Sequence, residues 1–380
     1  MNITKPKKVN GQTTFTISNE KGLDVSFINS IRRTMLNDIN IVGFDTENEN
    51  NVYFVKNNTV LHNEYLEHRI GMIPLHINPD KYKPKSLLFV LNIRNETSNV
   101  IEVTTNHFDI YKIRADAPEF DIKDLDLATF KQIYIDEPLN QKEKDKILNP
   151  FKFRDTNHYI TITKLKDENI MGDDKEELLM FAIPTVSTGK HNARFNGVSL
   201  SAYNYSIDQE KADVEKKARG KDKEKAFENL DIQRFYKTDK LDRPNSYDFK
   251  IESQCYLPDM ACFQKSIDIL MENLKNLQTK VNEEDKEYVL IKDSDDIKNG
   301  HDIIIQNVDD TVGNPIQKII VQEFIELTKK RRVDFCSYVR PHPLYEHITF
   351  KLVSKEDPKV IISDAVNICL DILAEIKASL

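Results

Sequence analysis

The sequence has 380 residues, of which 39% are hydrophobic and 31% are charged, and this length suits two or three domains of roughly 100–200 residues each. A net charge of −8 argues against a chain whose main partner is a nucleic-acid backbone. No stretch approaches the ~18 consecutive apolar residues of a membrane span, and the first ten residues lack the apolar run of a secretory signal. We therefore expect an intracellular protein with no membrane contact.

Glycine and cysteine spacing exclude several kinds of site. The ten glycines form neither GxGxxG nor GxxxxGK[ST], so the common phosphate-binding loops are absent. No two cysteines form a CxxC pair, and their scatter does not resemble a disulfide framework. The cysteines are Cys255, Cys262, Cys336 and Cys369. We therefore expect reduced thiols and no zinc ribbon.

The N-terminal segment predicts a strand followed by a helix. Residues 13–19 alternate apolar and polar side chains, which is typical of a strand. In residues 27–39 the apolar side chains recur at helical spacing, with Arg32 and Arg33 beside the stripe. The stripe consists of Phe27, Ile28, Ile31, Met35 and Ile39.

The middle of the chain predicts a small sheet domain and an exposed charged segment. Short alternating runs, such as residues 87–93 and 159–165, fill the region 46–184 and are separated by Asp- and Lys-rich turns. Residues 208–225 are mostly charged with both signs mixed, which favours a solvated loop or helix over a binding patch.

The last third predicts a long helix and then a second strand-and-helix unit. Residues 260–281 carry a coiled-coil-like apolar stripe: Phe263, Ile267, Leu270, Leu274, Leu277 and Val281. The acidic residues 282–300 indicate a linker that enters the next unit. Strands are predicted at 301–307 and 347–353, a helix opened by Asn314 and Pro315, and a final helix from Ser363. The final helix has the apolar face Val366, Cys369, Leu370, Leu373, Ile376 and Leu380.

The two ends of the chain follow the same order of elements. Each runs strand, connector, an Asn-x-Ile helix and finally a long heptad-like helix, with Asn29-x-Ile31 in the first and Asn314-x-Ile316 in the second. We predict an α+β fold in which two such units pair as an intrachain pseudo-dimer, with a mainly β domain inserted in the first. The pairing residues are expected to be Phe27, Ile31, Met35, Phe263, Ile267, Leu270, Leu274, Leu277, Ile316, Ile320, Leu370, Leu373 and Ile376.

These patterns set the predicted domain boundaries. The first dimerisation domain is discontinuous and comprises residues 1–45 and 185–281. Residues 46–184 form the inserted domain, and residues 282–300 form the linker and the start of the second unit. Residues 301–380 form the second dimerisation domain.

One short stretch, "HNEYLEHRIGMIPL" at residues 62–75, gathers groups that could bind zinc. His62, Glu64, Glu67 and His68 would serve a metal-dependent hydrolase, and Glu64 and His68 have the i, i+4 spacing of a helical metal pair. His62 is half a turn out of phase with His68 on a helix, which favours a charged docking helix instead. On that interpretation Leu61, Tyr65, Leu66 and Ile70 are buried and Gly71 ends the helix.

The same region carries a family resemblance. "NNTVLHNEYLEHRIGMIPL" resembles the "TSVLxDExLAHRLGLIPL" segment of RNA polymerase II subunit 3 and of the archaeal D subunit. "NSIRRTML" resembles their "NSLRRVM" helix, which the bacterial alpha N-terminal domain shares more loosely. "TGKHNARFNGVSLSAYNY" and "FKIESQCYLPDMACFQKSIDIL" resemble later segments of the same subunit.

The C-terminal part resembles a different subunit, number 11 or archaeal L. "VDDTVGNPIQ" is similar to "EDHTLGNLIR", and "FCSYVRPHPLYEHITFKL" is similar to "FAGYRxPHPLxxxFxLRI". The two subunits are joined here, as in large cytoplasmic DNA viruses. The chain departs from the pattern at Pro315 and Gln317, where the family has Leu and Arg. Residues 76–89 also lack the cysteine cluster that holds zinc in eukaryotic subunit 3, so we expect no metal.

The resemblance implies a non-catalytic platform subunit of a DNA-directed RNA polymerase, with no catalytic residue and no cofactor of its own. Its partners would be the largest and second-largest subunits and small polymerase subunits, and DNA would be met only through the complex. It would act in the host cytoplasm and virion if viral, and otherwise in the nucleus. The expected partner-binding residues are Arg32, Arg33, His68, Arg69, Lys190, His191 and Arg194.

A nucleic-acid-binding module is the remaining alternative. In "FKFRDTNHYITITKLK", residues 151–166, aromatic and basic side chains alternate as stacking platforms require. Ordinary strand alternation explains the same pattern without a ligand.

Overall fold

The chain folds into two compact units with mixed α+β structure. The computed structural model describes residues 1–47, 51–114, 116, 120–125, 135–166, 175–219, 224–283, 285–328 and 330–380. The first unit comprises Met1–Ile39, Val198–Ser253 and Pro258–Leu380, and the second comprises Asn40–Gly197 and Gln254–Leu257. Parts of the predicted 46–184 domain and of the charged segment lie outside the described residues.

None of the described helices combines the length and the apolar character that crossing a membrane requires.

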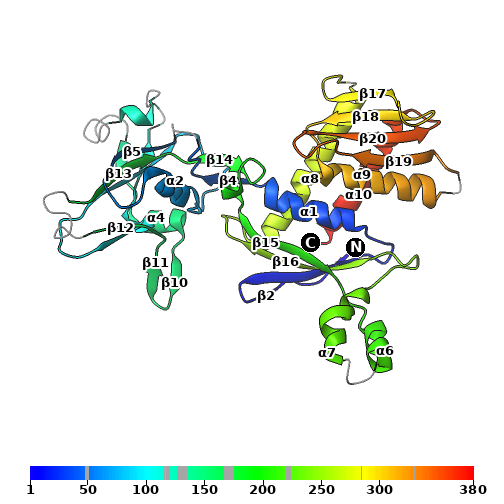
Figure 1. Cartoon of the computed structure of the whole chain (residues 1–380), viewed down its shortest axis with the longest axis horizontal. Helices are drawn as coiled ribbons and strands as arrows, with labels where there is room; N and C mark the ends of the chain where they lie inside the picture. Colours follow the sequence, from blue (N-terminus) through cyan, green and yellow to red (C-terminus); the bar gives the residue numbers. More distant parts are fainter. Residues whose placement is uncertain are drawn as a thin grey trace. The chain divides into compact units, whose positions relative to one another are not determined.

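The N-terminal sheet of the first unit is antiparallel and runs in the order β1-β3-β16-β15, with β2 also paired to β3 (Figure 1). The strands are β1 (Asn2–Ile3), β2 (Lys7–Val9), β3 (Gln12–Ser18), β15 (Val198–Tyr205) and β16 (Ser246–Ser253). Phe15 and Phe249 stack across β3 and β16 with ring centroids 5.6 Å apart, and Phe263 meets Phe15 edge-on at 5.1 Å. Because apolar side chains of β3 alternate inward, the predicted strand at 13–19 is confirmed.

Two helices accompany this sheet. Helix α1 spans Val25–Asn37 and helix α8 spans Asp259–Asn282, and both pack against each other. Their apolar positions are buried at the predicted helical spacing, which confirms the two predicted helices.

The C-terminal part of the same unit is a second antiparallel sheet with two helices (Figure 1). Its order is β17-β18-β20-β19, and both predicted strands of this region are present. The elements are β17 (Val289–Asp293), β18 (His301–Gln306), β19 (Val333–Val339), β20 (His347–Ser354), α9 (Asp310–Val321) and α10 (Pro358–Ala378). Strand β17 lies inside the segment predicted as linker and start of the second unit.

The start of α10 differs from the prediction. The helix begins at Pro358 and not at Ser363, because the side chain of Asp357 accepts a hydrogen bond from the Lys359 amide at 2.9 Å. Pro358 takes the first helical position, where its missing N–H costs nothing. An aspartate followed by proline is itself a signal for the start of a helix. Asp357 and Pro358 lie a few residues before Ser363, where the start was predicted.

The charged segment forms a small helical projection on the first unit (Figure 1). It consists of α6 (Gln209–Arg219), α7 (Glu224–Ala226) and a following turn. Ala212 and Phe227 are buried in it, while most side chains of α6 are exposed. The predicted solvated helix is therefore confirmed for residues 209–219.

The second unit is mainly β, with a sheet in the order β5-β13-β6-β8-β9 and three strand pairs, β12-β7, β14-β4 and β10-β11. Phe89 lies at the centre of its core and meets Phe44 and Phe108 edge-on, at centroid distances of 5.0 and 5.7 Å. The described residues of this unit include the helices α2 (Asn63–Gly71) and α4 (Gln141–Leu148). The strands are β4 (Asn40–Gly43), β5 (Val52–Asn57), β6 (Leu87–Arg94), β7 (Ile101–Thr104), β8 (Asp109–Ile113), β9 (Ile135–Pro138), β10 (Phe151–Phe153), β11 (Thr156–His158), β12 (Thr161–Leu165), β13 (Glu177–Ala182) and β14 (Thr185–Thr188).

Candidate functional site

Helix α1 begins at a capping aspartate. The side chain of Asp24 accepts a hydrogen bond from the Ser26 amide at 2.8 Å, which satisfies one of the free N–H groups of the first turn. Phe27, Ile31 and Met35 then follow on the buried face. Arg32 and Arg33 flank that face and are both partly exposed, as the sequence predicts.

Helix α9 begins in the same way. The side chain of Asp309 accepts from the Thr311 amide at 2.9 Å, so the helix starts at Asp310. The prediction that Asn314 and Pro315 open this helix is wrong, and Pro315 lies inside it. The capping aspartate allows the earlier start, because its side chain accepts a hydrogen bond from an amide of the first turn that has no partner within the helix.

The internal position of Pro315 leaves one backbone acceptor to be satisfied. In a regular helix the Thr311 carbonyl would accept the N–H of residue 315, but proline has none. The Oγ of Ser30 on α1 donates to this carbonyl at 2.6 Å, in a buried position. A side chain from one helix thus supplies the hydrogen bond that the other helix cannot make for itself.

Two ion pairs join α1 and α9 reciprocally. Arg33 stands nine residues after Asp24, and Lys318 stands nine residues after Asp309. Arg33 Nη2 lies 3.4 Å from the carboxylate of Asp309, and Lys318 Nζ lies 3.8 Å from that of Asp24. Each helix therefore places a cation at the cap of the other, as the two halves of a two-fold interface do.

The Arg33 side chain is further fixed by a hydrogen bond from its Nε to Thr311 Oγ1 at 3.0 Å. Much of its guanidinium is therefore used inside the chain. The sequence analysis missed Ser30, Thr311, Lys318 and the two capping aspartates, although the matching Asp-to-cation spacing is visible in the sequence.

Helices α8 and α10 pair in opposite directions. Gln278, near the end of α8, donates to Ser363 Oγ at 3.1 Å and Asn367 Oδ1 at 2.7 Å, near the start of α10. At the other end Lys377 Nζ lies 2.6 Å from the carboxylate of Asp268. All the residues predicted for intrachain pairing are buried except Leu370, which is half-buried.

Arg32 has different hydrogen-bond partners from Arg33. Its Nε donates to Asn29 Oδ1 at 3.0 Å, and no carboxylate of the described residues pairs with it. Arg32 is also close enough to Tyr203 of β15 to influence its ionisation: burial raises the pKa of the Tyr203 hydroxyl, and the Arg32 charge opposes that rise. Two of the Arg32 nitrogens thus remain available for a carboxylate or carbonyl from outside the chain.

The predicted basic turn lies in the second unit, where Arg194 is used internally. Its Nη2 lies 3.1 Å from Glu47 Oε1, its Nη1 contacts Thr46, and its Nε donates to Asn192 Oδ1 at 3.1 Å. Lys190 and His191 are exposed on the same turn. The basic turn therefore presents its lysine and histidine outward while its arginine holds a neighbouring loop.

Helix α2 contains the residues of the alternative metal site. Leu66 and Ile70 are buried and Gly71 ends the helix, as predicted, but the expectation of a buried Tyr65 is wrong because its side chain is 65% exposed. Leu66 and Ile70, four residues apart, set the buried face, and Tyr65 lies about 100° from Leu66 around the helix axis.

Two other residues of this stretch were predicted to bind a partner. Arg69 Nη2 donates to the Thr161 carbonyl at 2.7 Å and so ties α2 to β12, while His68 is exposed.

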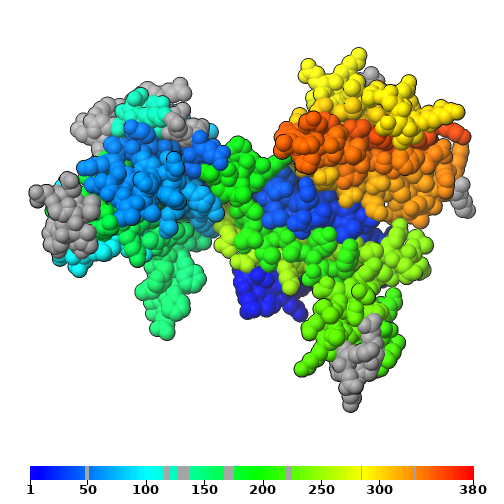
Figure 2. Space-filling view, viewed as in Figure 1, coloured from blue at the N-terminus to red at the C-terminus, as the bar shows by residue number. Residues whose placement is uncertain are grey.

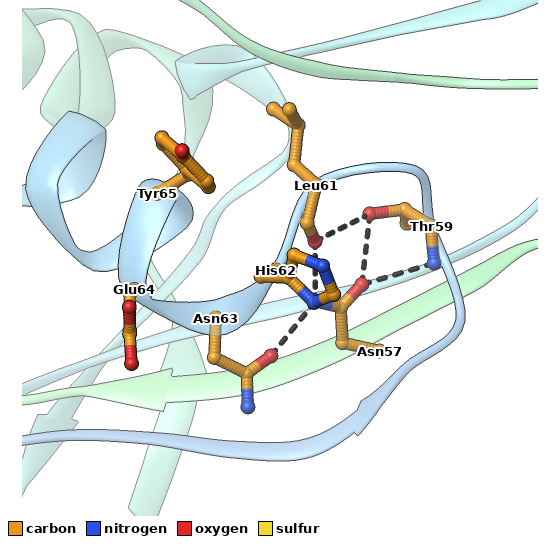
Figure 3. Close-up of a pocket in the computed structure, with 7 residues that line it drawn as sticks. All are labelled: Asn57, Thr59, Leu61, His62, Asn63, Glu64 and Tyr65. Atoms are coloured by element: carbon orange, nitrogen blue, oxygen red, sulfur yellow. Dashed lines mark hydrogen bonds between the residues drawn. The ribbon is translucent and has the colours of Figure 1, made fainter.

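An open hollow of about 580 Å³ lies at the start of α2 (Figure 3). Its hydrogen bonds centre on Asn57, whose Nδ2 donates to Asn63 Oδ1 at 2.7 Å and to the Leu61 carbonyl at 2.8 Å. His62 and Glu64 line the hollow but take no part in the hydrogen bonds around Asn57 (Figure 3). The Glu64 side chain points away from those hydrogen bonds. Across the described part of the chain, no three His, Cys, Asp or Glu side chains gather closely enough to hold a metal ion.

Two kinds of comparison relate parts of the chain to known proteins. Residues 301–379 match the RNA polymerase Rpb3/Rpb11 dimerisation domain. An 89-residue segment is 30% identical to DNA-directed RNA polymerases I and III subunit rpac1 of Dictyostelium discoideum, over 21% of this chain and 24% of that protein. A 58-residue segment is 38% identical to subunit RPAC1 of the same polymerases in Saccharomyces cerevisiae, over 15% of this chain and 16% of that protein.

The matched segments thus cover only a quarter or less of each relative. Within those limits, residues 301–379 are similar to the Rpb3/Rpb11 dimerisation domain, and both relatives are polymerase subunits. The matches support the resemblance of this chain to RNA polymerase alpha-like subunits.

Proposed function

We propose that this chain is a non-catalytic assembly subunit of a multisubunit DNA-directed RNA polymerase, on which the largest and second-largest subunits assemble. The proposal is supported by the dimerisation domain and by the names of the relatives, which are both polymerase subunits. Nucleotide addition would belong to the large subunits. Small polymerase subunits would be further partners, and an intracellular site of action follows from this role.

The observation that carries the proposal is the reciprocal contact between α1 and α9. Arg33 of α1 pairs with Asp309, and Lys318 of α9 pairs with Asp24. The two cations occupy equivalent positions in their helices, and each contacts the capping aspartate of the other helix. We infer that the subunit-3-like and subunit-11-like parts, normally separate chains, pair here as an intrachain pseudo-dimer. In this proposal, residues 1–45 and 185–281 pair with residues 301–380, and residues 46–184 are an insertion.

Arg32 is the residue we propose for contact with the second-largest subunit. Arg33, His68, Arg69, Lys190, His191 and Arg194 remain predicted partner contacts, and Arg33, Arg69 and Arg194 also hold the chain together. A guanidinium fork suits bidentate binding to a carboxylate or to backbone carbonyls. Since the hydrogen bond that Arg32 makes to the described residues uses its Nε, its other two nitrogens suit such a contact.

The test is to replace Arg32 by alanine in the full chain and to measure how much of the second-largest subunit co-purifies. Truncating an arginine that is hydrogen-bonded at an interface typically costs about 2–5 kcal/mol, equivalent to a loss of affinity of roughly 30-fold or more. Arg234→Ala is the matched control, because that side chain is 77% exposed on the helical projection and, among the described residues, forms its ion pair with its neighbour Asp231 at 3.4 Å.

We expect Arg32→Ala to lose the large subunit and Arg234→Ala to retain it, with equal thermal melts. Normal recovery of the second-largest subunit with Arg32→Ala would contradict the assigned contact. A chain purified from its native source without any large polymerase subunit would contradict the proposed function as a whole.

A further inference from the structure

The β10–β11 hairpin of the second unit projects from the body of that unit (Figures 1 and 2). Its register pairs Phe151 with His158, Lys152 with Asn157 and Phe153 with Thr156. Because side chains alternate across a strand, Phe151 and Phe153 share one face of the hairpin. Lys152 and Asn157 lie on the other face.

The two phenylalanines are exposed, at 69% for Phe151 and 53% for Phe153. The guanidinium of Arg154 lies 5.3 Å from the Phe153 ring centre, and the His158 ring lies 6.3 Å from it. Adjacent exposed aromatic rings on a soluble protein mark an interaction surface, since each ring carries a large apolar area into water.

The base of this hairpin is firmly held, so the surface is preorganised. Asp145 of α4 accepts hydrogen bonds from the Tyr159 hydroxyl at 2.7 Å and from Asn157 Nδ2 at 3.2 Å. Gln141 of the same helix donates to the Tyr159 hydroxyl at 3.0 Å. Since Asn157 faces α4, the Phe151/Phe153 face is turned away from that helix.

The charge around the hairpin is positive. Lys142, Lys146, Lys152 and Arg154 are exposed, and within the described part of the chain none of them is ion-paired. With Lys144 included, residues 141–158 hold five Lys and Arg side chains against the three carboxylates of Glu143, Asp145 and Asp155, which is a net charge of +2. This local excess of positive charge stands out in a chain of net charge −8.

We propose that the β10–β11 hairpin docks an acidic segment of another protein, one that places an apolar side chain against Phe151 and Phe153 and a carboxylate near Arg154, and that extends around the hairpin edge to place a further carboxylate near Lys152. Aromatic and arginine residues are the usual anchors of protein interfaces. A single-stranded nucleic acid fits less well, because Arg154 already covers one ring and Asp155 stands at the turn. A continuous basic groove along the backbone of the strand is needed for such ligands.

The experiment places the photoreactive residue p-benzoylphenylalanine at position 153 of the full chain, in its native complex, and maps the adducts by mass spectrometry. The matched control carries the same residue at position 65, because Tyr65 is 65% exposed and belongs to the same unit. We expect position 153 to yield an adduct with a protein segment rich in Asp and Glu, and position 65 not to yield it.

Charge reversal then tests the chemistry of the contact. Lys152→Glu with Arg154→Glu should lower the adduct yield at position 153 at least fivefold without changing the thermal melt, because both side chains are exposed. A synthetic peptide with the sequence of the crosslinked segment should bind the full chain. Phe151→Ser with Phe153→Ser should weaken that binding by about tenfold or more.

An adduct with nucleic acid, no intermolecular adduct, or a yield unaffected by charge reversal would overturn the proposal. The hairpin proposal is independent of the polymerase assignment. If the adduct forms with a protein that is not a polymerase subunit, the hairpin proposal stands, and the proposed function is decided separately by the co-purification of the large polymerase subunits.

Discussion

The hydroxyl of Ser30 and the backbone carbonyl of Thr311 form a buried hydrogen bond of 2.6 Å between residues 281 positions apart in the sequence. The acceptor is available because Pro315, four residues later, has no N–H. Leaving a buried carbonyl unsatisfied costs about 1–3 kcal/mol, so Ser30 and Pro315 form a coupled pair.

Ser30→Ala is therefore expected to lower the free energy of unfolding by about 1–3 kcal/mol, measured by urea denaturation. Pro315→Ala restores the N–H that the Thr311 carbonyl lacks. In that background the Ser30→Ala change should cost markedly less, and a double-mutant cycle measures the difference.

Ser26→Ala is the control for this cycle. The Ser26 hydroxyl is buried on the same helix but has no hydrogen-bond partner among the described residues. Its removal should cost little in either background. Equal losses for Ser30→Ala with and without Pro315 would show that the proline does not explain the bond.

The capping aspartates should differ in their response to alanine and asparagine. Asp309→Ala removes both the cap of α9 and the Arg33 ion pair, and caps of this kind contribute about 0.5–2 kcal/mol. Asp309→Asn keeps the cap and loses only a partly exposed ion pair, worth about 0–1 kcal/mol. Urea denaturation at low and high salt should show the Asn effect shrinking towards zero as salt rises, whereas the Ala effect shrinks by a similar amount and keeps the contribution of the cap.

Alkaline pH should destabilise the fold through Cys336. Burial raises the pKa of its thiol from 9.0 to about 12. The unfolded chain therefore loses this proton above pH 9 while the folded chain retains it up to about pH 12, and the free energy of unfolding falls across that window.

The measurement compares urea midpoints of wild type and Cys336→Ala between pH 8 and pH 10, because tyrosines and lysines titrate equally in both proteins. The wild type should lose up to about 1 kcal/mol more per pH unit than the variant above pH 9. Parallel pH profiles would refute the role of this thiol.

Gly197 should tolerate no side chain. A Cβ there would lie 2.5 Å from Ile41 Cδ1 and 2.8 Å from Cys255 Cβ, both in the second unit. Gly197→Ala is expected to cost about 1–3 kcal/mol through overpacking, measured by thermal denaturation. Ile41→Val removes the Cδ1 atom and should recover part of this loss in the double variant, whereas strictly additive losses would argue against the clash.

The sequence allowed prediction of the elements that depend on regular spacing. The apolar repeat of residues 260–281 determined α8 almost to the residue, because a buried stripe at helical period has few alternatives. The predicted start of α9 was wrong because proline usually occupies the first turn of a helix. Pro315 lies inside this helix, where Ser30 supplies the hydrogen bond that the proline cannot donate to the Thr311 carbonyl. A tertiary hydrogen bond of this kind has no local signature.

The predicted partner-binding residues show the same limit. Arg32 and Arg33 are adjacent and chemically alike, and no feature of the local sequence distinguishes their roles. Only the position of Asp309 and Thr311 in space shows that Arg33 bonds inside the chain. Which basic side chains remain available to a partner depends on contacts between distant segments, and spacing alone does not contain that information.

Helices α8 and α10 belong to one polypeptide, so their association is a unimolecular equilibrium. Its extent is set by an effective local concentration and does not fall when the protein is diluted, whereas two separate chains would dissociate. Synthesis also yields both helices in equal amounts. The pairing of these two helices therefore depends on no balance between the amounts of two separately made chains.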